Sequence, residues 1–66
     1  MEKIIENAGW AIGFEAFKVG KTSVPVHDKK LMEYLELIQD GGFTKVSAAI
    51  KGWSRGWHSA NVKLSR

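Results

Sequence analysis

The chain ends in T-K-V-S-A-A-I-K-G-W-S-R-G-W-H-S-A-N-V-K-L-S-R, residues 44–66, and the fold depends on how this stretch is read. Its apolar side chains recur at spacings of three and four residues: Val46, Ala49, Ile50, Trp53 and Trp57. This spacing is the period of one face of an α-helix. It predicts a C-terminal helix over residues 44–61, with Thr44 as its N-cap and both tryptophans on the face that packs into the core.

Two glycines inside this stretch leave two architectures open. If the helix runs through Gly52 and Gly56, the C-terminal segment is one continuous helix. If it breaks at Gly52, the pattern is similar to a helix-turn-helix whose second helix starts near Ser54, since a glycine in the turn fits that motif. The residues then available to a DNA major groove are Arg55, His58, Asn61 and Lys63.

The N-terminal part predicts a helix over residues 3–19 with two apolar stripes. One stripe contains Ile5, Ala8, Ile12, Ala16 and Val19, and the second contains Trp10, Phe14 and Phe17. A surface helix needs only one such stripe. The second stripe therefore either packs into the core or contacts another molecule, and we expect the core. Gly9 and Gly13 are four residues apart and permit another backbone to approach closely, while Gly20 is placed to end the helix.

A second helix is predicted over residues 29–39. Pro25 keeps the preceding segment, Thr22 to Val26, extended and outside any helix. Asp28 is an N-cap residue, and Leu31, Leu35 and Ile38 form the buried stripe. The run Asp40-Gly41-Gly42 ends the helix.

Together these segments predict an all-α fold, a single small three-helix domain over residues 1–66 with short loops. The expected core contains Ile5, Ile12, Phe14, Leu31, Leu35, Ile38, Val46, Ile50 and Trp53. A domain of 66 residues buries only about 60% of its unfolded surface, so helix packing, a homodimer or a larger partner must help to stabilise it.

The composition excludes several classes of site. The chain has no cysteine, and its two histidines, His27 and His58, are far apart, so we expect no disulfide, no metal site and no cofactor. We do not expect an enzyme, because no acid follows Asp40 to complete a triad with the serines near His58. No signal peptide and no apolar run of about 20 residues is present, which predicts a cytoplasmic protein with no membrane segment.

Charge is divided unevenly along the chain. Residues 1–40 contain seven acids and five lysines (−2), whereas residues 41–66 contain five cations and no acid (+5), which sum to the net charge of +3. Such asymmetry is typical of a surface that meets phosphate or an acidic partner. We therefore predict a nucleic-acid or partner-binding surface made of Lys45, Lys51, Arg55, Trp57, His58, Lys63 and Arg66, with Trp57 at its edge.

Two short segments carry a resemblance. They are G-F-E-A-F-K-V-G-K, residues 13–21, with Pro25 shortly after, and W-S-R-G-W-H-S-A, residues 53–60. Together they resemble ribosome modulation factor, a family of small basic bacterial proteins, and the layout also looks like small proteins of phages and plasmids. Val24 and Val26 replace the Cys and Tyr that flank the proline in that family. The resemblance implies binding to ribosomal RNA through basic and aromatic residues.

Three kinds of partner thus remain open. The favoured one is RNA or the ribosome, bound by the basic, Trp-containing C-terminal helix. The second is an acidic host protein, bound and modulated by a mobile-element protein, since Trp and Arg are enriched at binding hot spots. The third is DNA, bound by a helix-turn-helix.

Overall fold

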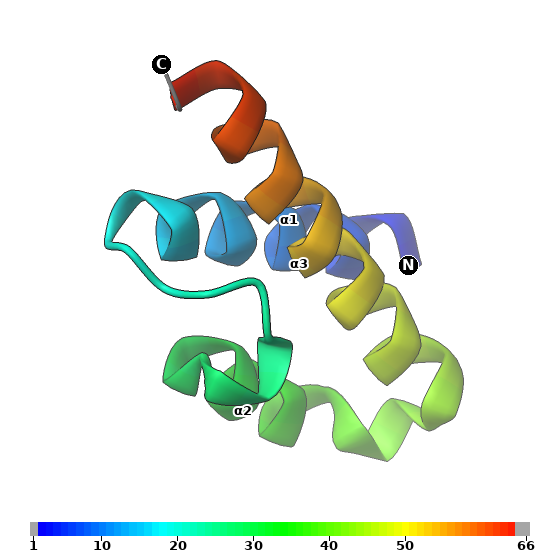
Figure 1. Cartoon of the computed structure of the whole chain (residues 1–66). Coiled ribbons are helices and arrows are strands. Elements are labelled where there is room, and N and C mark those ends of the chain that lie inside the picture. Colours follow the sequence, from blue (N-terminus) through cyan, green and yellow to red (C-terminus); the bar gives the residue numbers. More distant parts are fainter. Residues whose placement is uncertain (1, 65–66) are drawn as a thin grey trace.

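The computed structural model describes residues 2–64 and confirms an all-α fold with three helices (Figure 1). The elements are α1 (Glu2–Lys18), the 3-10 turn η1 (Pro25–His27), α2 (Lys29–Ile38), the 3-10 turn η2 (Gln39–Gly41) and α3 (Phe43–Leu64). The helices predicted at residues 3–19, 29–39 and 44–61 are all present. Helix α2 begins where predicted, the other ends differ by one residue, and α3 continues three residues further.

Helix α3 runs without a break through Gly52 and Gly56. The turn that the helix-turn-helix interpretation required is therefore absent, and that interpretation is wrong about the architecture. A glycine inside a helix costs about 1 kcal/mol relative to alanine. Both glycines are buried in the packing between α1 and α3, and this packing offsets their cost.

The ends of the helices follow capping chemistry. Gly20 has φ +86°, and the N–H groups of Gly20 and Lys21 donate to the carbonyls of Phe17 (3.0 Å) and Ala16 (2.9 Å). This is a Schellman motif, which confirms Gly20 as the cap of α1. Asp28 caps α2 as predicted, because its side chain accepts a hydrogen bond from the Lys30 N–H at 3.0 Å.

The start of α3 and the connector before α2 differ from the prediction. Thr44 lies inside α3, and the carbonyl of Gly42 accepts the first helical hydrogen bond, from the Val46 N–H at 3.3 Å. Gly42 has φ +86°, a conformation that glycine adopts without strain, so α3 begins at Phe43, two residues before the start at Lys45 that a Thr44 cap implies. Val24 is extended, but Pro25–His27 turns as η1 because proline is favourable in the first turn of a helix.

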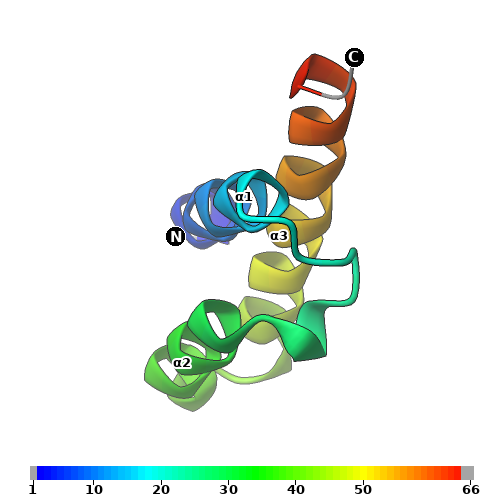
Figure 2. The ribbon, with the colours of Figure 1, turned by 60° about the vertical axis from the view of Figure 1, so that its left-hand side comes forward.

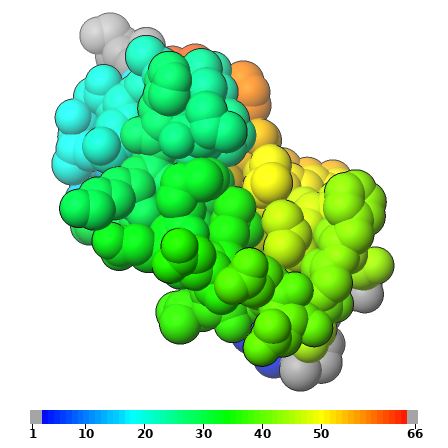
Figure 3. Space-filling model, turned by 90° about the horizontal axis from the view of Figure 1, so that it is seen from below, coloured from blue at the N-terminus to red at the C-terminus, as the bar shows by residue number. Residues whose placement is uncertain are grey.

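The three helices form a thin, elongated domain whose Cα atoms span 39 × 20 × 12 Å. Helix α1 crosses the middle of α3, and α2 lies beside the N-terminal half of α3 (Figures 1 and 2). The last turns of α3 project past α1. Seen from below, α2 and the connector before it lie in front, with the end of α1 on one side and the first turns of α3 on the other (Figure 3).

The core contains smaller side chains than predicted. Ile5, Leu31 and Trp53 are buried as expected, but the other six predicted core residues are only half-buried: Ile12, Phe14, Leu35, Ile38, Val46 and Ile50. The buried hydrophobic residues absent from the predicted core are three alanines, Ala16, Ala49 and Ala60. Because α1 and α3 approach closely, only small residues fit between them, and larger side chains lie along the flanks of the crossing.

No helix within residues 2–64 combines the length and the apolar character that a membrane span requires.

Candidate functional site

The contact between α1 and α3 is built by two pairs of glycines. Gly9 and Gly13 of α1 lie against the backbone of Ala49 and Trp53, and Gly52 and Gly56 of α3 lie against the backbone of Glu6 and Trp10. A Cβ atom at Gly13 would lie 2.8 Å from the Trp53 carbonyl carbon, and one at Gly56 would lie 2.7 Å from that of Trp10. No side chain fits at these positions, so the close approach requires glycine.

The pairing also sets the geometry of the crossing. Contacts advance together along both helices, from Gly9 to Gly13 on α1 and from Ala49 to Trp53 on α3, so the helices run in the same general direction. At each glycine a hydrogen on Cα points toward a carbonyl oxygen of the other helix. Such Cα–H···O contacts recur at close helix–helix interfaces and contribute about 0.5–1 kcal/mol each.

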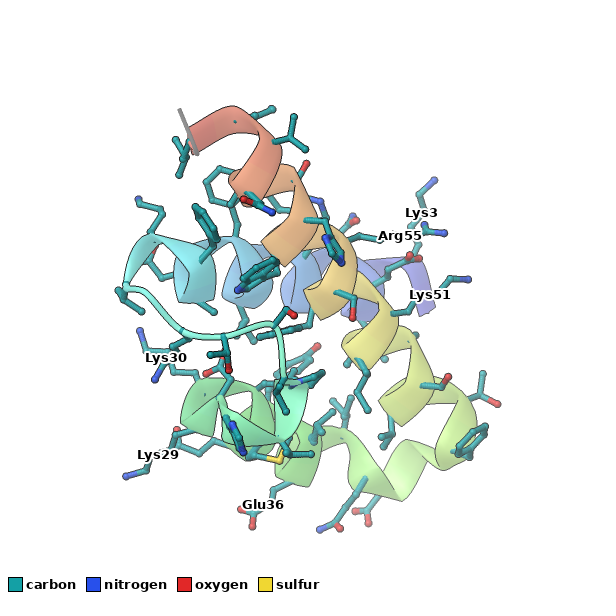
Figure 4. All side chains as sticks on the ribbon, viewed as in Figure 1. Lys3, Lys29, Lys30, Glu36, Lys51 and Arg55 are labelled. Carbon is teal, nitrogen blue, oxygen red and sulfur yellow. The ribbon has the colours of Figure 1, made fainter. Side chains whose placement is uncertain are left out.

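The crossing brings cations from the two ends of the sequence together. The Arg55 Nη1 donates to the Glu6 Oε2 at 2.9 Å, joining α3 to α1. Lys3 lies one turn before Glu6, and Lys51 lies one turn before Arg55; both lysines are exposed. We call Lys3, Lys51 and Arg55 the cation cluster; Figure 4 shows them on one side of the molecule. With the Glu6 carboxylate among them, the local formal charge is +2.

An aromatic pair lies next to this cluster on α1. The rings of Trp10 and Phe14 stack with centroids 5.0 Å apart and an interplanar angle of 24°. Trp10 lies one turn after Glu6, and its backbone touches Gly56, the neighbour of Arg55. Trp10 is 37% exposed and Phe14 is half-buried, so the second apolar stripe of this helix reaches the surface rather than the core.

Trp53 has a structural role at the centre of the fold. Its ring is fully buried, and its indole N–H donates to the Oδ2 of Asp28 at 2.7 Å. Asp28 is itself buried and uses its other oxygen to cap α2. One carboxylate therefore connects α2 to α3 by accepting a hydrogen bond on each oxygen. Removing either donor or acceptor would leave a buried polar atom without a partner.

Trp57 holds the end of α1 against α3. Its indole N–H donates to the Lys21 carbonyl at 3.0 Å, and its ring makes an edge contact with Phe17 at 5.1 Å. His58 contacts the same ring edge-on at 5.5 Å. The indole N–H of Trp57 thus already has a hydrogen-bond partner within the chain, and the side chain is half-buried.

The structure brings together some of the residues predicted to form the binding surface. Lys51, Arg55 and His58 are exposed, and their spacing of four and three residues places them on one face of α3. Lys45 is half-buried and its methylene groups lie against Gly41, while Lys63 lies in the last turn, beyond the crossing. Arg66 lies outside the described residues.

Two parts of the site were missed from the sequence. Lys3 is 48 residues from Lys51 and belongs to an acid-rich half of the chain, so no local signal pointed to it. Trp10 and Phe14 carried a signal, the second stripe of α1, but the core interpretation was preferred. Among residues 3–64, no group of three or more His, Asp or Glu side chains is placed to hold a metal ion.

Comparisons of the chain with protein-family models, with curated proteins and with solved structures found no match.

Proposed function

We propose that this chain is a small, non-enzymatic regulatory protein of the cytoplasm that binds RNA through the cation cluster and the adjoining face of α3. The observation that supports the proposal is the convergence of Lys3, Lys51 and Arg55, from two helices, on one exposed surface. Ribosomal RNA is the RNA that the resemblance of residues 13–21 and 53–60 suggests.

The chemistry of the cluster suits a phosphate backbone. Lysine ammonium groups act as mobile point charges, and the arginine guanidinium can bond phosphate oxygens in a fork. Helix α3 adds no acid to the surface, because residues 44–64 contain none. His58 extends the same face toward the C-terminus of α3.

Glu6 moderates this surface. Its carboxylate is bound to Arg55 at 2.9 Å, and the arginine side chain is 64% exposed. An exposed ion pair contributes at most about 1 kcal/mol, so a phosphate can displace the carboxylate at small cost. The pair thus holds the guanidinium over the crossing without preventing a contact with phosphate.

The test is a titration of a 5′-labelled RNA by fluorescence anisotropy at several salt concentrations. Three phosphate contacts on a single strand predict a log–log salt slope of about −2, since each contributes about −0.7. Lys51→Gln should weaken binding several-fold and reduce the slope by about one contact. Glu6→Gln should strengthen binding, because it raises the local charge from +2 to +3.

A matched control separates this surface from net charge alone. Lys29→Gln removes the same charge from the first turn of α2, on another side of the molecule (Figure 4), and should leave the affinity almost unchanged. Binding that does not depend on salt would contradict the proposal. So would equal losses from Lys51→Gln and Lys29→Gln, because they would show a general charge effect.

A second candidate, binding to a host protein, is favoured by exposed apolar side chains near the turn between α2 and α3. Leu37 at the end of α2 is 80% exposed and Phe43 at the start of α3 is 84% exposed. A pull-down with and without RNase distinguishes the two functions. A stoichiometric protein that survives RNase and is lost with Phe43→Ser would favour this candidate, whereas RNA that disappears with RNase would favour the first.

A further inference from the structure

We propose that the nucleic acid is single-stranded where it meets the protein, and that an unpaired base stacks on Trp10. This inference rests on the proposed function and adds the part of the ligand that the cation cluster does not explain. Cations alone attract the phosphates of any nucleic acid, paired or unpaired. Within a nucleic acid, only a base that has left the duplex stack can stack on an exposed aromatic ring.

Trp10 is distinguished from the other tryptophans by its hydrogen bonding. Trp53 donates its indole N–H to Asp28, and Trp57 donates to the Lys21 carbonyl. Within residues 3–64, Trp10 has no such acceptor. A surface indole packed by Phe14 on one side is held in place, and its N–H group and exposed area are left for a ligand.

The position of Trp10 fits a strand that follows α1. Lys3, Asn7, Trp10 and Phe14 recur at spacings of four, three and four residues, so they share one face of the helix. This face is about 16 Å long, because eleven steps of about 1.5 Å separate Lys3 from Phe14. Phosphates at Lys3 and Arg55 would direct the following bases toward the indole. Single-strand binding surfaces combine cations that contact the backbone with aromatic rings on which bases stack.

The experiment compares four probes by anisotropy: a labelled RNA 15-mer without self-complementarity, the same sequence in DNA, and both as duplexes. The wild-type protein should bind the single strands more tightly. Trp10→Leu should weaken single-strand binding about tenfold, equal to 1.4 kcal/mol, and change duplex binding less than twofold. Trp10→Phe keeps an aromatic ring and should retain most of the affinity, which also controls for folding.

The outcomes separate this inference from the proposed function. If the protein binds single strands and duplexes equally and Trp10→Leu has no effect, base stacking is wrong while binding through the cation cluster stands. If Trp10→Leu and Trp10→Phe lose affinity equally, the ring does not stack on a base and the inference is also overturned. If none of the four probes is bound, the proposed function itself fails. A preference for single-stranded RNA over DNA would indicate a further contact to the 2′-hydroxyl. Equal affinity for the two would show that contacts to the base and the phosphates account for the binding.

Discussion

Gly13→Ala tests the close contact between α1 and α3 most directly. The added Cβ would lie 2.8 Å from the carbonyl carbon of Trp53 and 2.9 Å from its Cα, whereas an ordinary contact is 3.4–4 Å. Both obstructing atoms belong to the backbone, and Trp53 is held by its bond to Asp28, so no side chain can rotate away. The helices must separate for alanine to fit.

The expected loss of stability follows from two opposed terms. Alanine favours a helix by about 1 kcal/mol over glycine. Overpacking costs roughly 1–3 kcal/mol, and a clash between two backbones should cost at least the upper value of this range. The net loss should be about 2 kcal/mol, out of roughly 3–10 kcal/mol expected for a domain of this size. The melting temperature should fall by about 10 °C.

Urea denaturation followed by circular dichroism measures this loss, with Gly41→Ala as the matched control. Gly41 does not have a positive φ, and its added Cβ would meet only the flexible side chain of Lys45. The control should therefore change stability by less than about 0.5 kcal/mol. If Gly13→Ala instead stabilises the protein by about 1 kcal/mol, helix propensity alone governs the site, and the close approach of the two backbones is refuted.

Three further substitutions test the other contacts. Asp28→Asn leaves one acceptor oxygen for two donors, so urea denaturation should show a free energy of unfolding lower by about 1–3 kcal/mol. An unchanged midpoint would mean that the position of the Trp53 indole does not depend on the carboxylate. Trp57→Phe removes an exposed hydrogen bond but keeps an aromatic ring, so thermal denaturation should show a loss of stability of no more than about 1 kcal/mol. A larger loss would show that the fold depends on the hydrogen bond to the Lys21 carbonyl. Arg55→Glu should keep the helical circular dichroism spectrum, because the pair with Glu6 is exposed, yet it should weaken RNA binding more than Arg55→Gln. Loss of the helical spectrum would show that Arg55 is needed for folding rather than for binding.

Local patterns in the sequence were sufficient for most of the secondary structure. The three-and-four periodicity of α1, α2 and α3, the cap at Asp28 and the left-handed glycine at Gly20 all act within a few residues of where they occur. Their effects do not depend on the rest of the fold. Thr44 was misplaced because Gly42 can adopt a positive φ and start the helix earlier, a choice between neighbouring residues that propensity does not resolve.

The composition of the core could be predicted only in part. Leu31 and Trp53 were identified by period, and the close approach predicted at Gly9 and Gly13 is confirmed. The buried alanines were not selected as core residues, because a small residue carries little hydrophobic signal. Gly52 and Gly56 alone suggested a break as readily as a contact. Gly9 and Gly13 of α1 have the same spacing of four residues as Gly52 and Gly56 of α3. Because the two pairs pack together, the glycines of α3 form a packing surface rather than a turn.

The sequence by itself determined three helices, the caps at Gly20 and Asp28, and a C-terminal segment rich in cations and aromatic rings. The tertiary structure decided which charges and rings meet. It paired Glu6 with Arg55 and placed Lys3 on the same side of the molecule as Lys51, although 48 residues separate them (Figure 4). It also gave Trp53 and Trp57 hydrogen-bond partners within the chain, while Trp10 stayed at the surface. The physical reason is that periodicity acts along one helix, whereas the neighbours of a side chain depend on how closely two helices approach and where they cross.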